Sequence, residues 1–427
     1  MLNDPRSHGL WERTAPPAPV TRPLLGAVTA DMAVIGAGYT GCSAALHLAQ
    51  AGARVVVLER AEVGFGAAGR NVGLANAGLW VMPQDIITAL GEDHGNRILN
   101  LLGNGPAEVW DIITAHDIAC EATHNGTLHL AVGKAGLKEL EERCAQWQAR
   151  GAPVSLLDKA ETERRVGTRA YEGALLDLRA GTVQPLAYVR GLARAAMAAG
   201  AAIHTASPVE RVEVAGKGWR LSTPQGHVDA DWVIVATDAY TTQPFAELRL
   251  EQVHLPYFNF ATAPLSAEQR ARILPGLEGC WDTKEVLNSF RMDAAGRLVF
   301  GSVGALRGPG ASIHRNYSRR ALARLFPDLK GIAFESEWYG MIGMTSDNIP
   351  RFHRLGHRVI CFAGYNGRGI GTGTVFGRVL AEHILGKIAE ADLPLPLAAP
   401  AAIRNRRFKE LYYETGAQAA HFVDQRI

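Results

Sequence analysis

The sequence predicts an α/β protein (α+β overall) in which a Rossmann-like domain is interleaved with a second domain built on an antiparallel sheet. Three observations lead to this prediction. Residues 31–59 read as strand, glycine turn, helix and strand, and end in an acid. The apolar run 230–237 lacks the alternation of a half-exposed strand, as expected for a strand buried on both faces of a parallel sheet. Residues 252–341 instead show short β-rich stretches around one helical segment, 318–325.

The first unit carries the residues of a dinucleotide site. Gly36 allows a tight turn, Gly38 allows close approach of the backbone to a pyrophosphate, and Gly41 allows the helix to pack on the strand. The N-terminus of the helix, at Tyr39 and Thr40, offers unpaired N–H groups to phosphates. Glu59 follows Gly41 by 18 residues, where a carboxylate accepts hydrogen bonds from ribose hydroxyls, so NAD or FAD is favoured over NADP.

The remaining elements follow along the chain. Helical patterns fill 85–117 and 134–148, and 126–132 predicts a strand between them. A helix at 186–199 follows a proline, and the alternating runs 202–206, 209–214 and 219–222 predict strands of a small sheet. A last apolar strand, 359–362, leads through a glycine-rich loop into a helix that ends near residue 385.

These elements divide the chain into interleaved domains. We expect the nucleotide-binding domain to comprise 28–90, 155–245 and 340–390, and the substrate-binding domain to comprise 91–154 and 246–339. Residues 1–27 then form an N-terminal arm, and residues 391–427 a C-terminal extension.

Composition excludes several classes of protein. At 427 residues, with 47% hydrophobic and 20% charged residues, the chain is typical of a globular protein with more than one core. The net charge of +2 and the lack of a long apolar run indicate no nucleic-acid or membrane partner. The polar N-terminus lacks the apolar segment of a signal peptide, and the five cysteines show no paired spacing, so we expect a cytoplasmic protein with reduced thiols. The fourteen histidines show no HExxH or similar spacing, which predicts that no metal is bound.

Five ordered motifs together resemble the FAD-dependent amine and amino-acid oxidoreductase family, the group of D-amino acid oxidase, glycine oxidase and sarcosine oxidase. The first motif is the glycine turn with Glu59, and the third motif is the apolar strand at residues 230–237. The second, 66–73 (GAAGRNVG), is similar to the family's GASGRNGG loop. The fourth, 343–350 (GMTSDNIP), and the fifth, 363–369 (AGYNGRG), are similar to its MTPDxxP turn and AGxxGHG flavin loop. The arm and the 66–73 loop most resemble the branch that contains gamma-glutamylputrescine oxidase, and iminodiacetate-type oxidases also fit.

The resemblance implies an FAD site. A loop of backbone N–H groups at 367–369 provides the positive potential that a reduced flavin requires. Gly340 stands where sarcosine oxidase carries its flavin-linking cysteine, and no histidine lies within 60–90, so we expect non-covalent FAD. The expected cofactor-binding residues are Gly36, Gly38, Tyr39, Thr40, Gly41, Glu59, Arg60, Gly66, Ala67, Ala68, Arg70, Asn71, Val72, Gly73, Val209, Ala236, Thr237, Gly340, Gly364, Asn366, Gly367, Arg368, Gly369 and Ile370.

The implied chemistry is oxidation of a small amino acid or secondary amine by hydride transfer to the flavin, followed by imine hydrolysis and reoxidation by O2. An obligatory side-chain base is not expected, because a neutral amine suffices. A substrate carboxylate calls for an arginine fork, and we expect Arg368 or Arg291 to supply it, with Arg307 and Arg351 as further options. An amine dehydrogenase with another electron acceptor and a non-catalytic FAD-binding protein remain alternatives, and the oligomeric state stays open.

Overall fold

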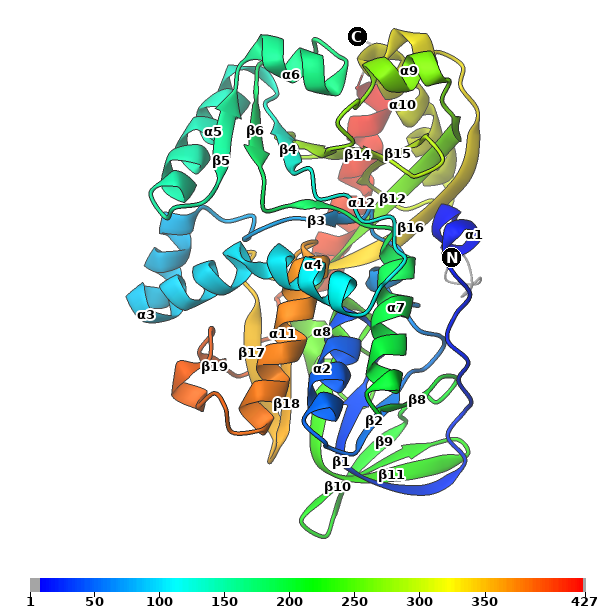
Figure 1. Ribbon diagram of the computed structural model, residues 1–427, viewed down its shortest axis with the longest axis vertical. Coiled ribbons are helices and arrows are strands. Elements are labelled where there is room, and N and C mark those ends of the chain that lie inside the picture. The colour runs from blue at the N-terminus through cyan, green and yellow to red at the C-terminus, as the bar shows by residue number, and fades with distance from the viewer. Residues whose placement is uncertain (1–7, 425–427) are drawn as a thin grey trace.

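The computed structural model describes residues 8–424 and shows two large sheets, one in each half of an elongated molecule (Figure 1). The first sheet lies in the lower half, with helices against one face, and the second sheet fills the upper half. This arrangement confirms the predicted α/β fold, in which a parallel Rossmann-like sheet is combined with a mainly antiparallel one.

The first sheet is built around parallel strands. Within residues 8–424 it has nine strands in the order β19-β17-β18-β11-β1-β2-β8, with β10 and β9 continuing from β11. In chain order these strands are β1 (Gly26–Ile35), β2 (Val55–Leu58), β8 (Ala202–His204), β9 (Arg211–Ala215), β10 (Gly218–Thr223), β11 (Gly226–Val235), β17 (Arg351–Gly356), β18 (Val359–Ala363) and β19 (Leu397–Ala398). The neighbours β2, β1, β11 and β18 run parallel, which brings their carboxyl ends to one edge of the sheet.

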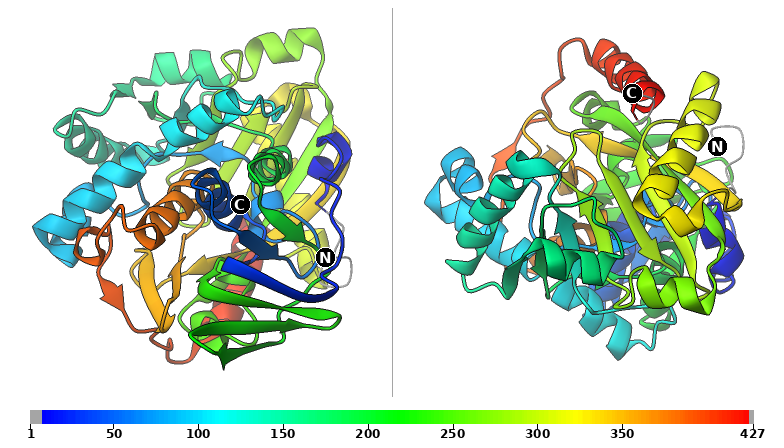
Figure 2. Two further views of the ribbon diagram at one scale, coloured as in Figure 1. Left: turned by 60° about the horizontal axis from the view of Figure 1, so that its bottom comes forward. Right: turned by 90° about the horizontal axis from the view of Figure 1, so that it is seen from above.

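Three helices cover one face of this sheet. They are α2 (Tyr39–Gln50), α7 (Pro185–Ala198) and α11 (Gly369–Ile384). Seen from below, the three lie side by side with α2 in the middle (Figure 2, left). Because α2 is packed on both flanks and on the sheet, ten of its twelve residues are buried, and its small alanine, glycine and serine side chains permit this close packing.

The second sheet is long and mixed. Its eight strands within the described chain follow the order β16-β12-β15-β14-β13-β4-β6-β5. They are β4 (Thr127–Leu130), β5 (Val154–Leu157), β6 (Ala174–Asp177), β12 (Val253–Pro264), β13 (Gly279–Asp282), β14 (Asn288–Met292), β15 (Arg297–Val303) and β16 (Phe334–Met344). All neighbours are antiparallel except β13 and β4, which are parallel. A two-stranded ribbon, β3 (Leu74–Ala75) with β7 (Gly181–Thr182), lies between the halves.

Helices flank the second sheet at both ends of its strand order. The C-terminal helix α12 (Arg406–Val423) packs on β12 and on α10 (Pro309–Leu325), whereas α5 (Gly133–Gln148) packs beside β5 and β6 (Figure 2, right). The other helices are α1 (Leu10–Thr14), α3 (Pro83–Gly103), α4 (Gly105–Ala115), α6 (Lys159–Val166), α8 (Ala246–Leu250) and α9 (Ala267–Arg272). Between residues 8 and 424, none of the helices combines the length and the apolar character that a bilayer crossing requires.

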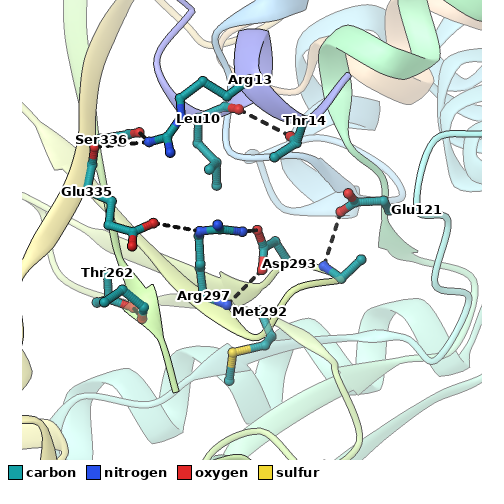
Figure 3. Close-up of polar contacts among 12 residues, drawn as sticks. Leu10, Arg13, Thr14, Glu121, Thr262, Met292, Asp293, Arg297, Glu335 and Ser336 are labelled. Carbon is teal, nitrogen blue, oxygen red and sulfur yellow. Dashed lines mark hydrogen bonds and ion pairs between the residues drawn. The ribbon is translucent and has the colours of Figure 1, made fainter. Parts of the chain in front are cut away.

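The N-terminal arm is part of the packed structure. Its helix α1 buries Leu10 and Trp11 completely, and the Trp11 ring meets Trp338 of β16 edge to face at 5.4 Å. Arg13 donates to the carbonyl of Glu335 and to the hydroxyl of Ser336 on the same strand (Figure 3). The sequence suggested only an extended arm, because five residues are too few for a helical period to be detected.

Strand pairing departs from the expected domain boundaries at two places. Strands β5 and β6 lie within or at the edge of residues 155–245, which we expected to belong to the nucleotide-binding domain. Both strands nevertheless pair in the second sheet. Strand β16 crosses the boundary expected at residue 340 and belongs wholly to the second sheet. The C-terminal extension also contributes β19 to the first sheet and α12 to the second half. These partnerships are set by long-range packing, which composition along the chain does not record.

A candidate flavin site at the carboxyl edge of the parallel sheet

Residues from three of the five sequence motifs follow the carboxyl ends of four neighbouring parallel strands. Ile35 at the end of β1 pairs with Leu58 of β2 and with Val235 of β11. Strand β18 continues the same edge beside β11 and ends at Ala363. The residues that come next in each case are Gly36, Glu59, Ala236 and Gly364, so segments more than 300 residues apart in sequence meet at one edge. This is where open α/β sheets bind their ligands.

A cavity of about 540 Å³ opens at this edge and extends between the two sheets. The predicted residues that line it are Gly36, Gly38, Tyr39, Thr40, Glu59, Arg60, Gly66, Ala67, Ala68, Arg70, Asn71, Val72, Val209, Ala236, Thr237, Gly340, Asn366, Gly367, Gly369 and Ile370. Gly73 and Gly364 stand beside this lining at positive φ, and Gly41 lies in the first turn of α2.

The glycines of the first turn have distinct structural roles. Gly36 adopts a φ of 105°, which L side chains rarely adopt, and a Cβ there would lie 2.9 Å from the carbonyl oxygen of Ala236. A Cβ on Gly41 would lie only 1.9 Å from the carbonyl oxygen of Gly36, so this glycine lets α2 approach the strand end. A Cβ on Gly38 would meet nothing nearer than 3.8 Å, which leaves its backbone open to the cavity.

Glu59 is buried at the end of β2 and holds the turn. Its carboxylate accepts hydrogen bonds from the backbone N–H of Ala37 at 2.8 Å and of Ala61 at 2.9 Å. Burial raises the pKa of Glu59, and these two backbone donors oppose that shift. A carboxylate has about four acceptor positions, so the group still has capacity to accept from a ligand hydroxyl.

The 66–73 loop is fixed by side-chain hydrogen bonds. The Asn71 amide donates to the carbonyl oxygens of Ala67 and Ala68 at 3.0 Å each, and its own oxygen accepts the Gly73 N–H at 2.9 Å. The Tyr39 hydroxyl donates to the Ala68 carbonyl at 2.7 Å. Trp11 of the N-terminal helix donates to the Asn71 carbonyl at 2.9 Å. The loop is therefore ordered by the protein alone.

The 364–370 loop is held in a similar way. Asn366, at a φ of 51°, accepts the Thr345 N–H at 2.8 Å and donates to the Gly364 carbonyl at 2.6 Å. The half-buried Asp238 accepts the Gly364 N–H at 2.7 Å and so ties the end of β11 to the loop after β18. Sequence reasoning missed Asp238, although an acid directly after a buried apolar strand is a visible signal of such a role.

The two arginines expected to bind substrate are placed differently from the prediction. Arg291 lies outside the cavity lining, because its guanidinium donates to the carbonyls of Val183 and Met292 beside the Trp11 ring. Arg368 also lies outside the lining: it donates to the Ala77 carbonyl at 2.8 Å and packs against two tryptophan rings. Arg307 and Arg351 are paired with Glu414 and Asp347.

An arginine that the sequence did not single out lines the cavity instead. Arg143 of α5 is 7% exposed and donates to the carbonyl oxygen of Trp80 at 2.9 Å. It lies on the apolar face of its helix, between the buried positions Leu140 and Cys144. A charged residue at a core position of an amphipathic helix was the signal that could have found it.

One group of potential metal ligands is present among the described residues. His8, Glu12 and Glu62 bring their ligand atoms within 4.8 Å of one another. Glu12 also pairs with the buried Arg190 at 2.9 Å. Burial, followed by the nearby Arg70, lowers the pKa of His8. A cation at this group would face two guanidinium charges, so we assign the three residues to the packing of the N-terminal arm.

Comparison with known proteins decides the family. Residues 31–383 match the protein family described as FAD dependent oxidoreductase. The chain belongs to this family. A gamma-glutamylputrescine oxidoreductase from Escherichia coli is 32% identical over 372 residues, 86% of this chain and 86% of that protein. A probable oxidoreductase from Rhizobium meliloti, OrdL, is 30% identical over 405 residues, 93% of each chain.

A solved structure has the same fold. The iminodiacetate oxidase from a Chelativorans species gives a TM-score of 0.68 at 19% identity, over 87% of this chain and 100% of that one. The family match and the relatives together identify this protein as an FAD-dependent oxidoreductase that acts on amines or amino acids.

The cavity of this flavoenzyme fits FAD in two respects. The helices α2 and α11 both begin at it, and within residues 8–424 neither N-terminus is capped by a side chain, so their N–H groups are left for a ligand. A Cβ at Gly369 would meet no atom within 4 Å, and one at Gly38 would meet only Ala68, which leaves room beside both N-termini.

Proposed function

We propose that this enzyme oxidises the C–N bond of a small amino acid or secondary amine, with FAD held non-covalently and O2 as electron acceptor. N-substituted glycines, iminodiacetate-like diacids and gamma-glutamylputrescine-like amines are the proposed substrate types. The observation that carries the proposal is the pair of uncapped helix N-termini at one cavity whose far end is walled by aromatic rings.

The proposed cofactor contacts follow the cavity. The N-terminus of α2 faces the pyrophosphate, Glu59 faces the ribose and Val209 faces the adenine. The N-terminus of α11 and the Asn366–Gly367 backbone face the flavin carbonyl edge, where positive potential stabilises the reduced ring. Within the described chain no cysteine lines the cavity, which supports non-covalent binding. The five cysteines are free, buried thiols, consistent with a cytoplasmic protein.

The substrate would enter between β12, β13 and the rings beside the flavin loop. Trp80, Trp281 and Tyr257 line this end, and Trp80 donates to the Asn366 carbonyl at 2.5 Å. Trp80 therefore joins the wall of the substrate end directly to the proposed flavin loop. Aromatic walls exclude water and limit the orientations in which an amine binds.

The cavity groups support oxidation of a neutral amine without a side-chain base. Burial raises the pKa of Tyr257, whose hydroxyl shares a hydrogen bond with Ser289 at 2.8 Å, so this phenol stays protonated at neutral pH. Lys284 is paired with Asp424 at 3.0 Å. FAD, when bound, supplies the acceptor for the hydride equivalent that leaves the carbon beside nitrogen. Water then converts the imine product to a carbonyl compound and an amine.

The test is spectroscopic. Purified enzyme is expected to be yellow with a band near 450 nm, and an amine of the correct class is expected to bleach that band without oxygen. The panel is iminodiacetate, sarcosine, glycine, D-alanine and gamma-glutamylputrescine. Release of H2O2 on admission of air would distinguish an oxidase from a dehydrogenase. A flavin that no member of a broad amine panel bleaches would contradict the proposed function.

A further inference from the structure

The exposed aromatic side chains of the protein gather on one helix. Within residues 8–424, every phenylalanine or tyrosine that is exposed to solvent belongs to the C-terminal helix α12. Phe408 is 70% exposed, Tyr412 65% and Phe422 50%, and they are joined by Leu411 at 59% and Val423 at 51%. Figure 2 (right) shows α12 at the edge of the molecule. Contiguous apolar surface of this kind marks an interaction site.

The apolar residues form a single stripe along the helix. Leu411 and Ala419 lie four residues before and after Thr415, and Phe408 and Phe422 lie seven residues before and after it. Steps of three and four residues keep side chains on one face of a helix. The stripe is therefore symmetric in position about Thr415, and its spacing is that of the seam between two paired helices.

The opposite face of α12 is fixed to the body of the protein. Glu410 accepts the backbone N–H of His254 at 2.8 Å and also pairs with Arg249. Arg320 of α10 donates to the carbonyl oxygen of His421 at 2.7 Å, and the His421 ring is buried. The stripe is thus presented on a helix that is already ordered, which lowers the entropy cost of binding a partner.

The charges of α12 favour a particular partner. Arg404, Arg407 and Lys409 are exposed at or just before its first turn, whereas residues 415–423 contain no Lys, Arg, Asp or Glu. Cations at the N-terminus of a helix oppose its own dipole, and they are favoured beside the C-terminal end of another helix. A helix that binds an anionic lipid surface is instead rich in cations along its polar face. The arrangement therefore suits an antiparallel partner helix.

The exposed area matches the apolar part of a dimer interface. An aromatic side chain offers about 200 Å², so the exposed parts of Phe408, Tyr412 and Phe422 amount to about 370 Å². Leu411 and Val423 raise this area to about 500 Å². An interface of standard size buries about 800 Å² on each partner, of which about 60% is apolar. The stripe alone supplies that apolar share.

We propose that the outer face of α12 binds α12 of a second copy of this chain in an antiparallel arrangement, with the two-fold axis at Thr415. Leu411 then lies opposite Ala419 of the partner subunit, so that a large side chain meets a small one. Phe408 lies opposite Phe422 of the partner subunit, and the basic end of each helix lies beside the C-terminal end of the other. The contact is isologous and closes as a dimer.

Sedimentation of the FAD-loaded enzyme at about 1 to 100 µM tests the assembly. The wild type is expected to reach twice its chain mass of 45.9 kDa at the upper concentrations. Leu411→Glu places a carboxylate in each half of the seam and is expected to raise the Kd of the dimer at least 10-fold. Val214→Glu changes a residue of β9 that is 74% exposed, and it is expected to leave the Kd unchanged. Retention of the flavin absorbance shows that each variant is folded.

Disulfide trapping tests the antiparallel register. In Thr415→Cys the two introduced thiols face each other at the two-fold axis, so oxidation is expected to give a covalent dimer. In Ala419→Cys each thiol is four residues from the axis, which separates the pair by about 12 Å along the helices and prevents a disulfide. The five native cysteines are buried, which keeps the background low. A parallel pairing would trap both variants.

Four results would overturn the proposal. They are a monomeric wild type at the highest concentration, a dimer that Leu411→Glu does not weaken, and trapping of Ala419→Cys as readily as Thr415→Cys. The fourth is binding of the wild type, but not of Leu411→Glu, to vesicles of phosphatidylcholine and phosphatidylglycerol, because this would assign the stripe to a lipid surface.

Discussion

Replacing Gly377 by alanine tests whether the close crossing of α2 and α11 shapes the cavity. A Cβ at this position would lie 2.6 Å from the Ser43 Cβ and 2.6 Å from the Thr40 carbonyl oxygen. Non-bonded carbon atoms in contact lie about 3.5 to 4.0 Å apart, so the two helices must separate by about 1 Å. The separation also strains the hydrogen bond from the Ser43 hydroxyl to the Thr374 carbonyl, now 2.7 Å.

The expected magnitude follows from three contributions. Alanine in a helix interior is favoured over glycine by about 1 kcal/mol. Overpacking against a neighbouring backbone costs about 1 to 3 kcal/mol, and weakening one buried hydrogen bond costs about 1 kcal/mol. Gly377→Ala should therefore lower the free energy of unfolding by about 1 to 3 kcal/mol. Gly416→Ala, in α12 with no atom within 4 Å of its Cβ, should instead raise it by about 1 kcal/mol.

The two variants are compared by urea unfolding, followed by tryptophan fluorescence, and by the FAD retained after dialysis. Both substitutions gain the same helix propensity, so the difference between them isolates the helix contact. Gly377→Ala should also lose FAD faster than wild type, because both helices begin at the cavity proposed to hold the cofactor. Equal unfolding free energies for the two variants, with FAD retention unchanged, would refute this account of the crossing.

Three other predictions concern separate regions. Trp11→Phe removes the hydrogen bond to the Asn71 carbonyl and should weaken FAD binding about 5-fold, as measured by equilibrium dialysis. Unchanged FAD affinity would show that the N-terminal arm does not support the 66–73 loop. Glu59→Gln places an amide N–H₂ group against the backbone donors of Ala37 and Ala61 and should lower FAD affinity about 10-fold in the same assay. An affinity equal to that of the wild type would contradict the role of Glu59 in holding the glycine turn. Burial lowers the pKa of His421 to about 3 and the pKa of His314 to about 4, and the two rings share a hydrogen bond of 2.8 Å. Below pH 6.5 the folded state therefore binds fewer protons than the unfolded state. The free energy of unfolding should then have its full value above pH 6.5 and should fall towards pH 4, by up to about 2.7 kcal/mol per pH unit for the two groups together. His421→Asn should flatten this pH dependence in urea unfolding. An unaltered slope would contradict the role assigned to the two rings.

The glycine motifs could be placed at the ends of parallel strands from sequence alone because each glycine requirement is local. Gly36 needs a positive φ, and Gly41 needs the space that a Cβ would occupy, so residue identity records the geometry directly. The arginine that lines the cavity, Arg143, was not predictable in this way. Whether Arg143, Arg291 or Arg368 reaches the cavity depends on how α5, β14 and α11 pack against the two sheets. That packing is a long-range property, to which the residues around each arginine contribute only indirectly.

The meeting of Trp11 with Trp338 has a consequence for how the protein is made. Trp338 and Trp11 both donate hydrogen bonds into the 66–73 loop, at the carbonyls of Arg70 and Asn71. Since 327 residues separate the two tryptophans, translation at about 5 to 20 residues per second places their emergence roughly 16 to 65 s apart. The N-terminal helix can pack on α7 early in synthesis, but it lacks its β16 neighbour until the last third of the chain has been made. A product that ends before β16 therefore lacks one of the two tryptophan donors that hold the 66–73 loop.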